Sequence, residues 1–354
     1  MSPRNASTTT IDVALDGAPG LVHADLSAPG YGRRRHGRGF SFLAPDGGRL
    51  ADPKALAHCR ALVIPPAWEG VWICRQTNGH ILCTGIDERK RKQYLYHPLW
   101  NEWRNRRKFA NLAEFAACLH RVRDATARDL KGARVSRRRV VAAAVRLVDR
   151  GLVRVGNEAY TRDNSTFGAT TLRTKHVATE PDGSITLDFN GKSNKERHVA
   201  FEDPALARSL AYCAELPGQR LFQYADDDGT VHPVTSSDVN AYLRAASGLE
   251  DVSAKDFRTW GGTVKMVTCL EAVLAEEPDL APEKVIKKAV KDVAAGLGNT
   301  PTVCSKYYIH PQIVTLFKSG KLIDYLREHD APPAKGDVLS GTERLVLRML
   351  EEVA

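Results

Sequence analysis

Two hydrophobic periods divide the chain. Between residues 31 and 98, apolar side chains fall in short runs such as 40–43, 71–74 and 80–83, and the first of these runs alternates apolar with polar positions. Alternation is typical of strands that bury one face, and the Asn78-Gly79 pair between the last two runs is typical of a tight hairpin turn. This part of the chain is therefore predicted to form a small, mostly β unit.

One short helix is predicted within this unit. Asp52 carries a side chain that caps helices well, and Pro53 suits the first helical position. The helix is expected to end near Ala61, because the run Ile64-Pro65-Pro66 cannot continue it.

Beyond Trp100 the apolar positions take the period of a helix. An amphipathic pattern that begins near Leu99 continues through residues 115–130. Ser136 is a plausible cap for a second helix over 137–150, whose valines and alanines fall on one face. These segments predict a mainly helical region after the β unit.

A small sheet is expected to interrupt this helical region. Strands are predicted at 171–177, 185–189 and 198–201, and turn residues separate them. Lys192 lies between the second and third strands, so it is placed on a hairpin tip from which it can reach outward.

The chain after Asp203 is predicted to be helical again. A turn at 226–229 breaks it, helices begin near Ser253 and Pro282, and a last amphipathic helix covers 342–352.

The predicted fold class is therefore α+β, with a small β-rich N-terminal domain and a larger, mainly α domain that holds a minor β-sheet. We expect a flexible tail over 1–22, the β-rich domain over 23–105 and the mainly helical domain over 106–354.

Charge adds a candidate partner to this picture. The 354 residues include 51 Lys and Arg against 42 Asp and Glu, for a net charge of +9 and a pI near 9.2. A basic balance favours a polyanion, either nucleic acid or an acidic membrane surface. No apolar run approaches membrane-spanning length and the N-terminus has no signal-peptide core, so we expect a cytoplasmic protein with no membrane partner.

The seven cysteines indicate neither disulfides nor a metal site. Their number is odd, they are spread widely, and no two of them form a Cys-x-x-Cys pair. Buried small side chains in a reducing compartment are the favoured interpretation. No cluster of His, Cys and carboxylates has ligand spacing, so no metal and no cofactor are expected.

Five residues suggest chemistry on a phosphodiester. Arg154 and Arg258 can hold phosphate oxygens, the Asn299 amide can donate to another oxygen, Lys192 can protonate a departing alkoxide, and Tyr308 can attack phosphorus. Taken singly, each residue type is more often structural, and Tyr307 is a rival nucleophile beside Tyr308.

Their local sequences resemble those of the type IB DNA topoisomerases, in particular the small branch found in bacteria and poxviruses. The motifs are Val-Arg-Val-Gly, Asn-Gly-Lys, Lys-Asp-Phe-Arg-Thr-Trp-Gly and Lys-Tyr-Tyr-Ile-His-Pro. The resemblance selects Tyr308 as nucleophile, takes Tyr307 as scaffold, and makes Lys192 the general acid for the 5′-oxygen. Lys195 remains a rival for that last role.

Asn299 departs from the poxvirus pattern, which has a histidine at the matching position. An asparagine does not shuttle protons at neutral pH, but its amide can donate to a non-bridging phosphate oxygen. The residue therefore fits a hydrogen-bonding role and argues against obligatory proton transfer at this position.

The N-terminal unit carries a second part of the resemblance, in the segments 62–68 and 87–98. They contain a basic and aromatic cluster that could meet phosphates and base edges. Together with one lysine of the later region, the candidate DNA-binding residues are Arg91, Lys92, Tyr94, Tyr96 and Lys255.

The resemblance implies an enzyme that closes on double-stranded DNA as a monomer and relaxes supercoils without ATP through a 3′-phosphotyrosyl intermediate. Two alternatives stay open. Tyrosine recombinases share the Arg-Lys-Arg-Tyr chemistry, although their N-terminal domains are normally helical. A non-catalytic DNA-binding protein would use the same charge and keep the tyrosine as a structural residue.

Overall fold

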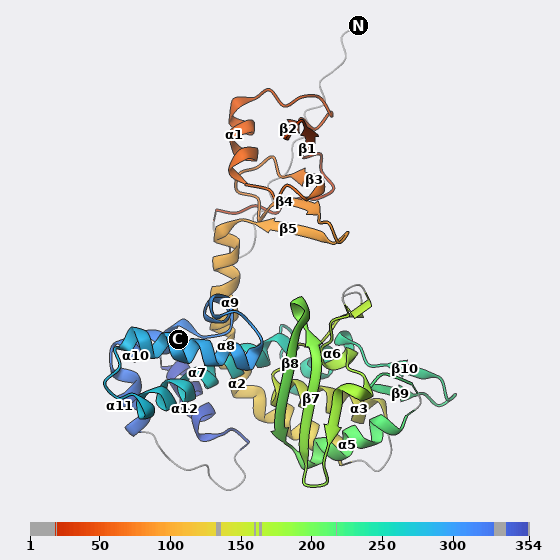
Figure 1. The fold of residues 1–354 in the computed structure, drawn as a ribbon, viewed down its shortest axis with the longest axis vertical. Coiled ribbons are helices and arrows are strands. Elements are labelled where there is room, and N and C mark those ends of the chain that lie inside the picture. The colour runs from red at the N-terminus through yellow and green to blue at the C-terminus, as the bar shows by residue number, and fades with distance from the viewer. Residues whose placement is uncertain are drawn as a thin grey trace. The chain divides into compact units, whose positions relative to one another are not determined.

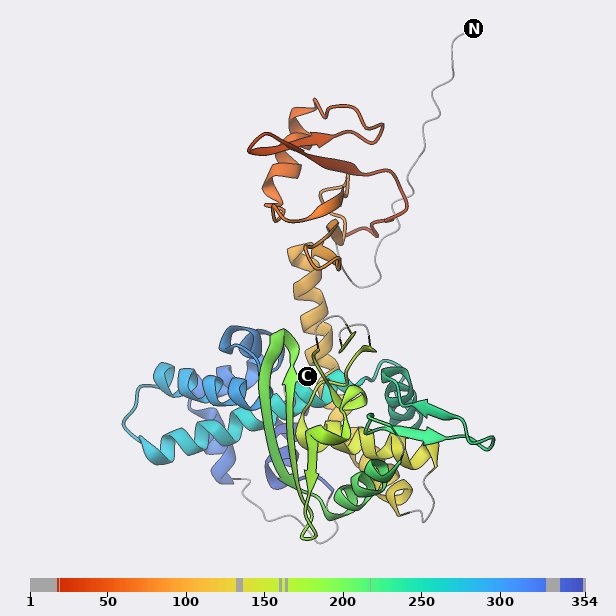
Figure 2. The same ribbon diagram turned by 45° about the vertical axis from the view of Figure 1, so that its right-hand side comes forward.

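The computed structural model describes residue 18 and residues 20–131, 136–158, 161–162, 165–216, 218–328 and 338–352. It divides into two compact units, Met1–Lys108 and Phe109–Ala354. We describe each unit by itself (Figures 1 and 2).

The N-terminal unit is built on a five-stranded antiparallel sheet with the order β2-β1-β3-β4-β5. Its strands are β1 (Tyr31–His36), β2 (Gly39–Leu43), β3 (Glu69–Ile73), β4 (Ile81–Ile86) and β5 (Lys92–Tyr96). The hairpin predicted around Asn78-Gly79 joins β3 and β4, as expected. The strand β5 is an edge of the sheet, so one side of its backbone has no neighbouring strand within it.

One helix and a small apolar core complete this unit. Helix α1 (Pro53–Ala61) begins as predicted, because the Asp52 side chain accepts a hydrogen bond from the Lys54 amide at 3.0 Å. Cys59 of this helix and Ile73 and Cys83 of the sheet belong to one core cluster and are almost fully buried.

The expected tail covers residues that the structure describes only in part. Its first 17 residues lie outside the described part of the chain. Leu21 and Val22 are buried, and the Val22 amide donates to the Asn78 carbonyl at 3.1 Å. The chain thus packs into the N-terminal unit before residue 22, where the tail was expected to end.

The second unit is mainly helical. Helix α2 (Pro98–Leu130) enters it at Phe109, and its buried positions Leu112, Phe115, Ala116 and Leu119 repeat at helical spacing. The further helices are α3 (Arg137–Gly151), α5 (Pro204–Glu215), α6 (Ser236–Ser247), α7 (Ala254–Glu276), α8 (Pro282–Leu297), α9 (Pro301–Tyr307), α10 (Pro311–Lys318), α11 (Lys321–Glu328) and α12 (Gly341–Glu351). The α+β class and the helix starts at Ser136, Ser253 and Pro282 are confirmed.

A three-stranded antiparallel sheet lies in this unit, with the order β6-β7-β8. Its strands are β6 (Val177–Thr179), β7 (Ser184–Gly191) and β8 (Lys195–Glu202). The strand predicted over 171–177 is wrong, because two 3₁₀ turns (Ala169–Thr171 and Thr174–His176) occupy most of it. Here Thr170 and Thr171 bond backbone carbonyls with their hydroxyls, and such local bonds compete with a strand.

A second hairpin was missed. The turn predicted at 226–229 joins the short strands β9 (Gln223–Ala225) and β10 (Val231–Pro233) instead of two helices. The strands are three residues long, which is too short for an alternating pattern to be recognised in the sequence.

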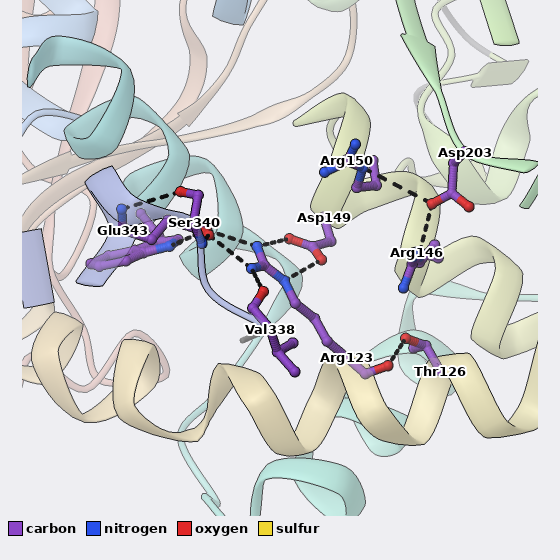
Figure 3. A network of polar contacts seen from close by, with 10 residues as sticks. Arg123, Thr126, Arg146, Asp149, Arg150, Asp203, Val338, Ser340 and Glu343 are labelled. Carbon is purple, nitrogen blue, oxygen red and sulfur yellow. Dashed lines mark hydrogen bonds and ion pairs between the residues drawn. The ribbon is translucent and has the colours of Figure 1, made fainter. Parts of the chain in front are cut away.

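A buried polar network fastens the last helix to the rest of the unit (Figure 3). Arg123 of α2 donates to Asp149 of α3 at 2.9 Å and to Glu343 of α12 at 2.8 Å. Glu343 also accepts a hydrogen bond of 3.0 Å from the Trp260 indole of α7. One guanidinium therefore joins α2, α3 and α12, and Glu343 extends the network to α7.

Candidate active site

Arg258 lies in the second turn of α7 and is almost fully buried, with 3% of its surface exposed. Its Nη1 donates to the carbonyl of Leu152, just beyond the end of α3, and its Nη2 donates to Leu297 at the end of α8, at 2.8 Å. Carbonyls at helix ends have no partner within their own helix, so a guanidinium fork satisfies both. The side chain is fixed by three helices.

The Arg258 guanidinium also lies over the ring of Tyr308, with its central carbon 5.1 Å from the ring centroid. Burial, together with repulsion from Arg154, lowers the pKa of Arg258 to about 10. The side chain is still protonated at neutral pH. A cation held against the phenol ring stabilises negative charge that develops on the phenol oxygen.

Helix α7 holds the backbone of Tyr308 as well. The Thr263 hydroxyl contacts the Tyr308 carbonyl at 3.4 Å and accepts the His310 amide at 3.1 Å. Gly262 allows this approach, because a Cβ added there would lie 2.5 Å from the Tyr308 carbonyl oxygen. Both Arg258 and the backbone at Tyr308 are therefore positioned by the same rigid helix.

Tyr307 lies in a different environment from Tyr308. Lys306 lies over its ring, at 5.5 Å from the centroid. Of the two neighbouring tyrosines, Tyr308 is the one whose ring meets the buried arginine.

Arg154 follows α3 in a segment whose backbone is closely packed. Its carbonyl accepts the Ala169 amide at 2.8 Å, and a Cβ on Gly168 would lie 2.5 Å from that carbonyl oxygen. The Arg154 guanidinium donates to Oδ1 of Asn299, from the loop between α8 and α9. Two predicted site residues that are far apart in the chain therefore meet.

Asn299 is held by the end of α8. Its backbone amide donates to the Ala294 carbonyl at 2.9 Å. Gly298, directly before it, takes the left-handed conformation (φ of 61°) that commonly ends a helix. With Oδ1 bonded to Arg154, the side-chain nitrogen Nδ2 has no hydrogen-bond partner among the residues that the structure describes.

Two donors at this site are buried and unpaired in the described part of the chain, Nε of Arg258 and Nδ2 of Asn299. Unpaired buried donors are rare, because each loses its bonds to water without replacement. An anionic oxygen would satisfy both. Arg154, Arg258, Asn299 and Tyr308 thus form a cationic, donor-rich site that suits a phosphate group.

The two candidate lysines are exposed. Lys192 lies between β7 and β8 at the hairpin tip, as predicted, and its ammonium makes no hydrogen bond or ion pair with any residue the structure describes. Lys255 lies in the first turn of α7, one turn before Arg258. The structure does not bring either ammonium into contact with Arg154, Arg258, Asn299 or Tyr308.

Sequence reasoning missed Arg197, a buried arginine of β8. Its guanidinium donates to the carbonyls of Ala295 and Gly296 at the end of α8. It lies close to the site, because a Cβ added at Gly298, beside Asn299, would be 2.5 Å from its Nη1, and burial together with repulsion from Arg154 lowers its pKa. The signal that could have found it is a charged residue in register with Phe189, on the inward face of the hairpin.

The N-terminal candidates form a strip on one face of β5. Lys92, Tyr94 and Tyr96 alternate along the strand, and the two rings stack with centroids 6.0 Å apart. Lys92 lies over Tyr94 and Arg104 of α2 lies over Tyr96. Arg91 differs from these residues, because it pairs with Asp87 at 2.7 Å and points its charge at that carboxylate.

Within the described ranges, no three His, Cys, Asp or Glu side chains gather as metal ligands would. No helix in the same ranges is both long enough and apolar enough to cross a membrane. The cysteines that were expected to be buried are so, except for Cys269, which is half-buried.

Comparison with known proteins assigns most of the chain to two family models. Residues 91–328 match the catalytic core of eukaryotic DNA topoisomerase I, and residues 39–87 match the N-terminal domain of bacterial DNA topoisomerase IB. The chain is 31% identical to DNA topoisomerase 1B of Acanthamoeba polyphaga mimivirus, over 86% of this chain and 92% of that protein. It is 21% identical to DNA topoisomerase 1B of vaccinia virus (strain Copenhagen), over 69% and 74%.

A solved structure of the XerH site-specific recombinase bound to palindromic difH substrate overlaps less well. The TM-score is 0.35 and the identity 16%, over 60% of this chain and 51% of that one. The family of this chain is therefore assigned from the two family models and the viral relatives, and not from this structure.

Proposed function

Because the chain belongs to the type IB DNA topoisomerase family, we propose that it relaxes supercoiled duplex DNA without ATP. One strand is cut, the duplex rotates about the intact strand, and the cut strand is resealed. The observation that carries this proposal is the buried Arg258, which lies over the Tyr308 ring and whose Nε has no hydrogen-bond partner in the described part of the chain.

In the proposed reaction, the Tyr308 phenol oxygen attacks the phosphorus of a DNA phosphodiester. The bond from phosphorus to the 5′-oxygen breaks, and a 3′-phosphotyrosyl link forms. The phenolic proton leaves to solvent and Lys192 donates a proton to the departing 5′-oxygen, which becomes a hydroxyl. The new link is again a phosphodiester, so the reverse attack by that hydroxyl reseals the strand without an energy source.

The remaining residues stabilise the phosphorane-like transition state. Arg154 and Arg258 hold the non-bridging oxygens, and the Asn299 amide donates to one of them. Preorganised donors in a dry site are worth more than the same groups in water, because they need no reorganisation as charge develops. The cations of this mechanism are all side chains, so the proposal includes no metal ion and no cofactor.

The N-terminal unit is proposed to hold the duplex. Cations and aromatic rings are available to the DNA backbone from Lys92, Tyr94 and Tyr96 of β5 and from Lys255 at the start of α7. We expect Arg91 to contribute less, because its guanidinium pairs with Asp87. Contacts of this kind bind DNA in a strongly salt-dependent way. The enzyme is proposed to act as a monomer in the cytoplasm, on the nucleoid.

The test is relaxation of negatively and positively supercoiled plasmid in EDTA without ATP. Wild type should relax both signs and leave protein attached to the 3′ end of the nick, and Tyr308→Phe should lose both properties. Tyr307→Phe is the matched control, since it removes the neighbouring hydroxyl and should still relax DNA.

Three other outcomes would redirect the proposal. Activity that survives in Tyr308→Phe and disappears in Tyr307→Phe would move the nucleophile by one residue. Binding without any covalent adduct would favour a non-catalytic DNA-binding protein. Activity only on plasmids with paired special sites would favour a recombinase.

A further inference from the structure

Arg197 connects two parts of the site that the chain builds separately. It lies on β8 within the hairpin that presents Lys192, and its guanidinium is buried. Nη1 donates to the Ala295 carbonyl at 3.0 Å and Nη2 to the Gly296 carbonyl at 2.7 Å. The hairpin is therefore bonded, through one side chain, to the end of α8.

The guanidinium end of this side chain contacts the residues that precede Asn299. Ala295 and Gly296 are in the last turn of α8, directly before Gly298 and Asn299. Gly298 leaves room for the guanidinium, because a Cβ added there would lie 2.5 Å from Nη1 of Arg197. Arg197 therefore contacts the segment that leads from α8 to Asn299.

The aliphatic part of the side chain contacts Gly191, the residue directly before Lys192. Gly191 pairs with Lys195 across the hairpin, and a Cβ added at Gly191 would lie 2.9 Å from Cγ of Arg197. The aliphatic stem thus packs against the residue directly before Lys192. Among the described side chains of this hairpin, Arg197 is the one that both hydrogen-bonds the end of α8 and contacts the residue before Lys192.

From these contacts we propose that Arg197 is a positioning residue, which holds the hairpin of Lys192 in register with the loop of Asn299. It touches no reacting atom in this role. Its effect is to bring the general acid to the phosphate that Arg154, Arg258 and Asn299 hold. The inference rests on the proposed function, since it assumes that Lys192 protonates the leaving oxygen.

A change of leaving group tests this role directly. An alkoxide needs a proton to leave, whereas a thiolate is a far weaker base and leaves without one. DNA with sulfur in place of the bridging 5′-oxygen therefore bypasses the general acid. The measurement is the single-turnover cleavage rate on both substrates, expressed as the ratio of the sulfur rate to the oxygen rate.

Arg197→Met keeps the stem and removes the fork. We expect oxygen-substrate cleavage to slow by about 10²-fold, the usual contribution of general acid catalysis, and the sulfur-to-oxygen ratio to rise at least about tenfold over wild type. Arg197→Lys should recover part of the oxygen rate, because an ammonium can bond one of the two carbonyls. Lys192→Ala should give the same rise in the ratio.

Two controls separate positioning from general loosening of the fold. Arg150→Met removes a guanidinium contact to the Glu202 carbonyl at the other end of β8, and its ratio should equal that of wild type. Asn299→Ala should slow both substrates equally. If Arg197→Met fails to fold, Gly191→Ala keeps the guanidinium but displaces its stem, and should raise the ratio in the same sense.

The outcomes distinguish this proposal from the one on which it rests. If sulfur rescues Lys192→Ala but neither Arg197→Met nor Gly191→Ala, Arg197 has no positioning role and the general acid stands. If sulfur rescues none of them, although wild type cleaves both substrates, Lys192 is not the general acid and the role proposed for Arg197 falls with it. If wild type forms no adduct with either substrate, the proposed function itself is overturned.

Discussion

The two regions that carry the candidate cations hold them in opposite ways. Near Tyr308, Arg197 and Arg258 are buried and bonded to backbone carbonyls, as Arg258 is to Leu152 and Leu297. On β5 the charge is exposed, and Lys92 lies over the ring of Tyr94 at 5.6 Å. The same kind of charge is therefore fixed in one region and free to adapt in the other.

The difference matters because burial and exposure suit different tasks. A desolvated guanidinium acts through a low dielectric and is held within the small tolerance that a transition state requires. An exposed ammonium is screened by salt and gains affinity mainly by releasing counterions from DNA. We expect changes in the buried region to alter the rate of cleavage, and changes on β5 to alter binding.

The largest effect should come from Arg258→Lys. The substitution keeps the charge, but an ammonium cannot reproduce a fork that reaches two carbonyls while Nε stays free for the phosphate. We expect single-turnover cleavage to fall by about 10²–10³-fold, as when one transition-state donor is removed. The dissociation constant for duplex DNA, measured by fluorescence anisotropy, should change little.

The matched control is Lys287→Ala, which removes an exposed charge from α8 and should leave the cleavage rate as it is. The distinction between the two regions would fail if Arg258→Lys weakened DNA binding as much as it slowed cleavage. In that case the buried arginine would act mainly as a binding residue.

A smaller effect, on stability, is expected from the network beneath the site. Glu343 is bonded to Arg123 and to Trp260, two residues after Arg258 on α7. Glu343→Gln leaves the Arg123 guanidinium without half of its carboxylate partners, so we expect a loss of about 3 kcal/mol in the free energy of unfolding at pH 7. Urea unfolding followed by circular dichroism measures it.

The pH dependence of this loss has a defined sign. Burial disfavours the Glu343 carboxylate, but its bonds to Arg123 outweigh that penalty and hold its pKa below the ordinary value. The unfolded state then binds more protons, so the stabilisation is complete above the ordinary pKa of 4.5 and is lost as the pH falls through the folded value. The difference in the free energy of unfolding between wild type and Glu343→Gln should therefore shrink between pH 5 and pH 3, on the scale of about one to two pH units that such titrations span. A difference that stayed constant over this range would show that the ionised carboxylate is not its source.

Local rules predicted much of this fold, and their failures have a physical cause. Caps at Asp52 and Ser136 fixed two helix starts, because the capping bond is made within a few residues. The strand predicted over 171–177 did not form, because threonine hydroxyls there bond the backbone around Arg154. Residues that support a site often break the local pattern in this way.

The contacts of the site were beyond such rules. The motifs selected Arg154 and Asn299, but their hydrogen bond joins residues 145 positions apart. Arg197 belongs to no motif, and its partners lie 98 and 99 positions further along the chain. Alternation along β8 places Arg197 on the inward face, in register with Phe189, but the sequence does not show its partners, because they meet it only once α8 is packed against the hairpin.

The smallest effect separates two neighbouring residues of the N-terminal unit. Arg91 is bonded to Asp87, and this bond lowers the pKa of Asp87 to about 2, whereas Lys92 has no carboxylate partner in the part of the chain that the structure describes. Lys92→Ala should reduce the slope of log affinity against log salt by about 0.9, the value for one lost phosphate contact. Arg91→Ala should leave that slope unchanged, because its charge is already neutralised by Asp87.

Asp87→Asn completes this test, and anisotropy titrations between 50 mM and 200 mM salt, about the range over which such slopes are defined, measure all three variants. Removal of the carboxylate frees the Arg91 guanidinium, so the slope should become steeper than that of wild type. If Arg91→Ala instead lowered the slope as much as Lys92→Ala, the ion pair would have to open when DNA binds. Arg91 would then join the adaptable cations of β5, and the contrast with Arg258, which is bonded to two backbone carbonyls, would be sharper.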